Sequence, residues 1–160
     1  MLTGLALAMA LGADPTVALG TGPKMCAALT AADFTAVGLS PDPTPPRPPN
    51  SDEKTGAYCT YTKAFPIAGG LEFDIFDGES DPAGVVETIL GEGGGKPTRA
   101  DLAGVDESLL ALSPGDKGVT MAALVVRHRR LVFVITIPST PKAKAQLVSL
   151  ATVVLARVKH

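Results

Sequence analysis

Two apolar runs joined by a short basic segment decide the fold that we predict for this chain. The runs cover residues 119–126 and 131–137, and the whole stretch reads VTMAALVV-RHRR-LVFVITI over residues 119–137. Both runs are rich in β-branched residues and have the length of buried strands. The four residues 127–130 form the connection between them, so the stretch predicts a β-hairpin with a basic tip.

Shorter patterns on either side of the hairpin predict three more strands. The β-prone residues 58–62 and the alternation of apolar and acidic residues at 71–75 indicate two of them. Residues 109–112 indicate a weaker strand, which precedes the turn Ser113-Pro114-Gly115-Asp116.

Helices are predicted in three places. Thr30 and Asp33 form a capping box that opens a helix at residues 30–37, and Asp81-Pro82 opens another that runs through Leu90. Ser139-Thr140-Pro141 caps a last helix of about eighteen residues. Its apolar stripe consists of Leu147, Leu150, Ala151, Val154 and Val158. The order α-β-β-α-β-β-β-α predicts an α+β fold: an antiparallel sheet of about five strands with helices packed on one face.

The composition fits a single folded domain. The chain has 160 residues and a net charge of −2, and 46% of its residues are apolar. This charge balance argues against a nucleic-acid binder, and the 4% of aromatic residues argue against a base-stacking platform. We therefore expect one α+β domain over residues 25–160, with a Pro-rich surface loop at 40–50, and we expect it to be a monomer.

The N-terminal segment indicates export. Residues 1–13 carry no charge, are too few to span a bilayer and fit the core of a secretion signal. No Lys or Arg precedes Lys24, so the signal would be truncated or atypical, and a buried or frayed N-terminal helix is the alternative. We expect residues 1–24 to be a signal-like or disordered segment, and the protein to be secreted or associated with the cell envelope.

The two cysteines agree with an oxidising compartment. Cys26 and Cys59 are the only cysteines of the chain, and an even count in an exported protein favours a disulfide bond. Two buried free thiols are the alternative. Metal ligation lacks further ligands, because His128 and His160 show no zinc spacing with the cysteines.

The sequence assigns no catalytic residue, cofactor or metal site. Residues 91–97 lack the first glycine and the Ser or Thr of a phosphate loop, and residues 77–88 lack the Gly and Glu of a calcium loop. A nucleophile elbow of the form Gly-x-Ser-x-Gly is also missing. Hydrolysis by paired carboxylates stays open, because any two of the sixteen acidic residues could meet in a cleft, but no sequence pattern selects a pair.

The basic hairpin tip is the one candidate binding site. Arg127, His128, Arg129 and Arg130 could meet an anionic envelope polymer or a lipid head group. The alternative is a solvated turn that keeps the hairpin soluble.

The segments around the two cysteines resemble a known group of exported proteins. Cys26-Ala27-Ala28-Leu29-Thr30, followed by Cys59-Thr60-Tyr61, resembles the start of actinobacterial exported domains of unknown function, which are often lipoproteins. The plan is similar to that of the extracellular sensor domains of mycobacterial serine/threonine kinases. The resemblance implies a secreted or envelope-associated domain with a Cys26–Cys59 bridge, and it implies no catalytic residues. Residues 22–25 do not form a lipobox, so a lipid anchor on Cys26 is not expected.

Together these observations favour an exported, non-enzymatic domain of unknown function that binds a ligand or an envelope partner. A small cell-envelope hydrolase that uses carboxylates and a purely structural interaction domain are the alternatives.

Overall fold

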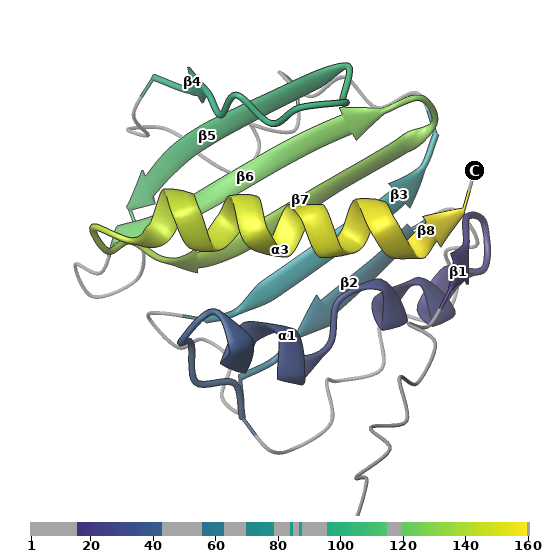
Figure 1. The fold of residues 1–160 in the computed structure, drawn as a ribbon, viewed down its shortest axis with the longest axis horizontal. Helices are drawn as coiled ribbons and strands as arrows, with labels where there is room; N and C mark the ends of the chain where they lie inside the picture. Colours follow the sequence, from purple (N-terminus) through teal and green to yellow (C-terminus); the bar gives the residue numbers. More distant parts are fainter. Residues whose placement is uncertain are drawn as a thin grey trace, which may run out of the picture.

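The computed structural model describes residues 16–42, 56–62, 70–78, 84, 87, 96–114 and 120–159, and Figure 1 shows their arrangement. The main element is a six-stranded antiparallel sheet with the strand order β2-β3-β7-β6-β5-β4. Its strands are β2 (Gly56–Thr60), β3 (Glu72–Asp77), β4 (Thr98–Arg99), β5 (Glu107–Pro114), β6 (Thr120–His128) and β7 (Leu131–Pro138).

The predicted hairpin is confirmed as β6 and β7. The two strands pair from Met121 with Pro138 to His128 with Leu131, which leaves a turn of two residues, Arg129 and Arg130. Residues 127 and 128 therefore extend β6 and do not belong to the turn. The hairpin forms the centre of the sheet, because β3 pairs with β7 and β5 pairs with β6.

The sheet has one strand more than the five or so that were predicted. The sixth strand, β4, is only two residues long and pairs with Leu109 and Leu110 of β5. A separate parallel pair consists of β1 (Val17–Ala18) and β8 (Val158–Lys159). Val158 was predicted to belong to the apolar stripe of the last helix, but it lies in β8 instead. Its side chain is buried all the same. Such short pairings leave no periodic pattern in the sequence.

Three helical elements whose bounds the structure gives lie on one face of the sheet. They are the 3-10 helix η1 (Gly22–Ala28), α1 (Ala31–Ala36) and α3 (Ala143–Arg157), and α3 crosses the sheet in Figure 1. The capping box at Thr30 and Asp33 is confirmed at the start of α1. The last helix is shorter than predicted, because its first residue is Ala143 and its last is Arg157.

Both faces of the central strands are buried, which explains why their sequences read as continuous apolar runs. Toward α3, Phe133 lies edge-on to Phe73 with ring centroids 6.2 Å apart, in the same core cluster as Leu147 and Leu150. A second buried cluster lies on the opposite face and consists of Ala111, Ala123, Val125 and Val134. Each large side chain that is fully buried contributes about 1.5–3 kcal/mol.

Several predicted features lie wholly or mostly outside the described residues. They are the N-terminal segment up to residue 15, most of the Pro-rich loop at 40–50, the glycine-rich residues 91–95 and most of the predicted helix at 81–90, of which Gly84 and Glu87 are described and helical. Within the described ranges, no helix has the length and hydropathy that a bilayer span requires.

A disulfide bond between Cys26 and Cys59 ties η1 to β2. Their Cα atoms are 5.8 Å apart, and the two residues are 33 positions apart in the sequence. The predicted bridge is therefore confirmed, and the alternative of two free thiols is wrong. Cys59 is buried in the core cluster, so the bridge anchors η1 to an edge strand of the sheet.

Removing this bridge should destabilise the domain substantially. Closing a loop of this length lowers the entropy of the unfolded chain by the equivalent of about 3.7 kcal/mol. We expect the Cys26→Ala/Cys59→Ala variant to lose about that much free energy of unfolding in urea titrations. Wild-type protein treated with reductant serves as the control and should match the variant, whereas a loss below about 1 kcal/mol would contradict the prediction.

Candidate functional site

A cavity of about 460 Å³ lies where the tip of the β6–β7 hairpin meets the β1–β8 pair. We call it the hairpin cavity; the elements that line it, β1, β8 and the β6–β7 turn, lie at the right-hand end of the sheet in Figure 1. Its lining residues are Ala18, Leu19, Asp77, Arg129, Arg130 and Lys159. Three cationic side chains and one carboxylate thus face a single cavity, which leaves two net positive charges.

The hairpin turn holds Arg129 in an unusual backbone conformation. Its φ is 55°, in the left-handed region that costs a non-glycine residue roughly 1–2 kcal/mol. The Asp106 carboxylate compensates, because its Oδ2 accepts a hydrogen bond of 2.6 Å from the Arg129 backbone N–H. Asp106 is in turn fixed by its own N–H, which donates to the Arg127 carbonyl over 3.0 Å. These two hydrogen bonds of Asp106 fix the backbone conformation of the hairpin turn.

Asp77 at the end of β3 positions the second arginine. Its Oδ1 lies 3.1 Å from Arg130 Nη2, and the Asp77 side chain is only 14% exposed. The Gly78 N–H also donates to the Arg130 carbonyl over 2.9 Å. Gly20 packs against the same carboxylate: its φ is 73°, and a β-carbon there would lie 3.1 Å from Asp77 Oδ2. The turn after β1 can approach Asp77 this closely because residue 20 is glycine.

The structure brings together two of the four predicted anion-binding residues. Arg129 and Arg130 line the cavity, but Arg127 and His128 do not. Arg127 lies in β6 instead, with its Nη2 3.9 Å from Glu107 Oε2 of the neighbouring strand. Within the described part of the chain, the side chains of Arg129 and Lys159 have no carboxylate partner. Sequence reasoning missed Lys159, because only the β1–β8 pairing places it beside the hairpin.

Two carboxylates share a face of β3 on the side opposite α3. Glu72 and Asp74 are two residues apart, so their Cα atoms are separated by about 7 Å along the strand. Burial raises the pKa of Asp74 to about 7, with a further increase from the negative charge of Glu72. Burial also raises the pKa of Glu72. Asp74 pairs with Val134, a member of the second buried cluster, which accounts for its poor solvation.

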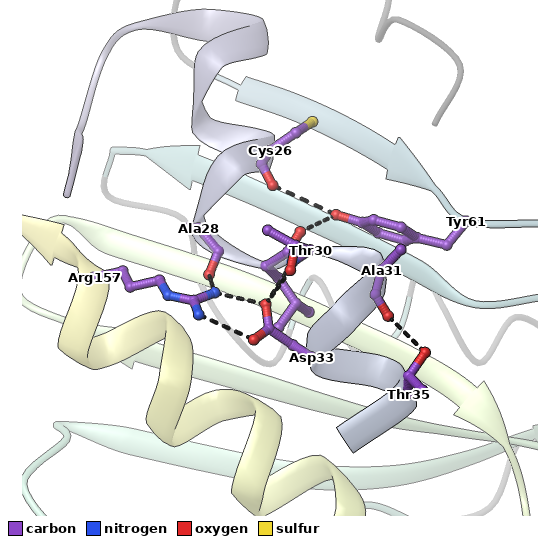
Figure 2. A network of polar contacts seen from close by, with 9 residues as sticks. Cys26, Ala28, Thr30, Ala31, Asp33, Thr35, Tyr61 and Arg157 are labelled. Carbon is purple, nitrogen blue, oxygen red and sulfur yellow. Dashed lines mark hydrogen bonds and ion pairs between the residues drawn. The ribbon is translucent and has the colours of Figure 1, made fainter. Parts of the chain in front are cut away.

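A partly buried polar network links the start of α1 to the end of α3, as Figure 2 shows. Arg157 at the end of α3 makes a two-pronged ion pair with Asp33, with Nη1–Oδ2 and Nη2–Oδ1 distances of 2.6 and 3.0 Å. The Thr30 N–H and Oγ1 both donate to the same Asp33 Oδ2 over 2.7 Å. The Tyr61 hydroxyl donates to the Leu29 carbonyl.

The electrostatics of this network indicate a structural role. Burial alone would raise the pKa of Asp33, but the hydrogen bonds from Arg157 and Thr30 outweigh it and lower the pKa below 3.8. Burial and the charge of Asp33 raise the pKa of Tyr61. Asp33 is thus a permanently ionised partner of Arg157 at neutral pH, and its oxygens are occupied by donors from the protein itself.

Among the described residues, no group of three or more His, Cys, Asp and Glu side chains could hold a metal ion. Comparison with protein-family models, with curated proteins and with solved structures finds no match for this chain.

Proposed function

We propose that this protein is an exported, non-enzymatic domain that binds an anionic ligand in the hairpin cavity. The observation that carries this proposal is the convergence of Arg129, Arg130 and Lys159 on one cavity of about 460 Å³. Cavities of about 300–1,000 Å³ are typical of small-molecule sites. Guanidinium groups match the geometry of carboxylate and phosphate groups, and the ammonium group of Lys159 adds a point charge.

The disulfide bond supports the export part of the proposal. Such bonds form and persist in secreted and envelope proteins, whereas the cytosol keeps thiols reduced. The Cys26–Cys59 bridge is buried on one side in the core cluster, and its removal is expected to be costly. These properties suit a stable structural bridge, in keeping with the resemblance to actinobacterial exported domains that the cysteine segments suggest.

The hydrolase alternative has weaker support. Asp74 has the raised pKa of a proton donor, and Glu72 is its neighbour on the same face of β3. Neither residue lines the hairpin cavity, however, and the apolar cluster beside Asp74 explains its pKa without a catalytic role. The ligand-binding function is therefore the one that the geometry supports best.

Sulfate is a suitable first probe of the site. We expect sulfate to shift the NMR amide signals of residues 18, 19, 129, 130 and 159 in a saturable way in the wild-type protein. The variant Arg129→Glu/Lys159→Glu should lose this response, because it replaces two attractive charges with two repulsive ones. Arg130 is left unchanged, since a glutamate there would face the Asp77 carboxylate and could disturb the fold.

The variant Arg99→Glu/Lys142→Glu is the matched control. Both of these residues are exposed, neither lines the cavity, and the change in net charge is the same. It should bind sulfate nearly as well as the wild type. Equal losses in the two variants, or an absence of saturable shifts in the wild type, would contradict the proposal.

A further inference from the structure

We infer that the ligand of the hairpin cavity is a phosphate monoester that carries a small organic group. This inference rests on the proposed function and narrows it to one ligand class. It follows from three properties of the cavity: its charge, its volume and the distribution of its polar and apolar walls.

The charge of the cavity suits a dianion. Arg130 Nη2 lies 3.1 Å from Asp77 Oδ1, so the charges of these two side chains largely balance each other. Arg129 and Lys159 supply the two charges that remain. A phosphate monoester has a second pKa near 6 and carries between 1.5 and 2 negative charges at pH 7, whereas a diester carries only one.

The volume has room for more than a phosphate group. If each of its five heavy atoms took no more than the roughly 30 Å³ of a water molecule, a phosphate would fill at most about 150 Å³. About two-thirds of the 460 Å³ would then remain beside it. This space can take an organic substituent of several heavy atoms.

The polar and apolar walls of the cavity indicate where the phosphate and the organic group of such a ligand would lie. Arg129 and Arg130 come from the hairpin tip and Lys159 from β8, so the phosphate would lie between these two elements. Ala18 and the half-buried Leu19 form the apolar wall on the β1 side, where the organic group would pack. Gly20, the residue after Leu19, packs against the Asp77 carboxylate, so the apolar wall lies beside this charged group.

Isothermal titration with small phosphates tests this inference. Glycerol 3-phosphate should bind at least tenfold more tightly than inorganic phosphate, and methyl phosphate at least tenfold more tightly than dimethyl phosphate. The second pair differs by one methyl group and one charge. Arg129→Gln and Lys159→Gln should each weaken glycerol 3-phosphate binding by about tenfold, as expected for a charge-assisted hydrogen bond. Arg99→Gln is the control and should have no effect.

Vesicles distinguish a free ester from a lipid head group. Binding to phosphatidylcholine vesicles that contain phosphatidic acid, a monoester lipid, would identify a membrane source if phosphatidylglycerol vesicles bind much less. Binding of glycerol 3-phosphate without vesicle binding would identify a soluble ester, and both results support the inference. Equal affinities for methyl and dimethyl phosphate would overturn it and leave the anion-binding function standing. If neither sulfate nor any of the phosphates binds, both the phosphate-monoester inference and the anion-binding function are overturned.

Discussion

Replacing Asp33 with alanine should lower the free energy of unfolding by about 3 kcal/mol, the lower end of the cost of removing one member of an ion pair from a protein interior, because this pair is only partly buried. The Arg157 side chain is only 11% exposed and makes its two-pronged ion pair with this carboxylate. Alanine would also remove the acceptor of the Thr30 hydrogen bonds at the start of α1. Urea unfolding at pH 7, followed by circular dichroism, measures the loss.

Two further variants separate the contributions to this effect. Thr30→Ala removes only the side-chain part of the helix cap and should cost about 1 kcal/mol. The double variant Asp33→Ala/Arg157→Met removes both charges and should be more stable than Asp33→Ala alone, because no unpaired charge remains. If Asp33→Ala costs less than the Thr30 variant, the ion pair does not stabilise the fold in the way described.

Asp74 should make the domain less stable as the pH rises from about 4 to about 7. Its pKa is about 7 in the folded protein, against 3.8 for an ordinary aspartate, so the folded state binds more protons than the unfolded state in this window. Stability must then fall with increasing pH and become constant above the folded pKa. Three pKa units correspond to about 4 kcal/mol, which is the upper limit of the effect.

Urea titrations between pH 4 and pH 8 test this dependence. Asp74→Asn cannot ionise, so it should flatten the slope and be more stable than the wild type at pH 8. Glu72→Gln removes a negative charge that raises the pKa of Asp74. The pH range over which stability falls should therefore end at a lower pH in this variant. If the free energy of unfolding depends on pH in the same way in the wild type and in Asp74→Asn, the Asp74 carboxyl does not cause the pH dependence.

The sequence predicts the centre of the fold well, because the information there is local. The two apolar runs of the hairpin and the alternation at residues 71–75 correspond to β6, β7 and β3. The capping box at Thr30 and Asp33 is also a local pattern and is confirmed. By contrast, β4 and the β1–β8 pair have two residues per strand, and only tertiary contacts define them.

The same distinction applies to the candidate site. Arg129 and Arg130 are adjacent in the sequence, so their cluster of charge could be recognised there. Lys159 and Asp77 join them only through the fold, from β8 and from the end of β3. The sequence could not indicate the ion-pair partner of Asp33 either, because Arg157 lies 124 residues further along the chain. For the same reason, the alternating pattern placed Glu72 and Asp74 on one face but could not indicate their burial.

The pairing of β1 with β8 has a practical consequence for protein engineering. Val17 is paired with Val158, and Ala18 with Lys159, so two segments from opposite ends of the described chain lie side by side. A short linker could join them in a circular permutant, with new ends opened in a surface loop elsewhere. The same proximity means that a label attached next to Lys159 stands at the mouth of the hairpin cavity. A fluorophore at that position would serve as an optical sensor of occupancy, whereas a bulky purification tag there would obstruct the cavity.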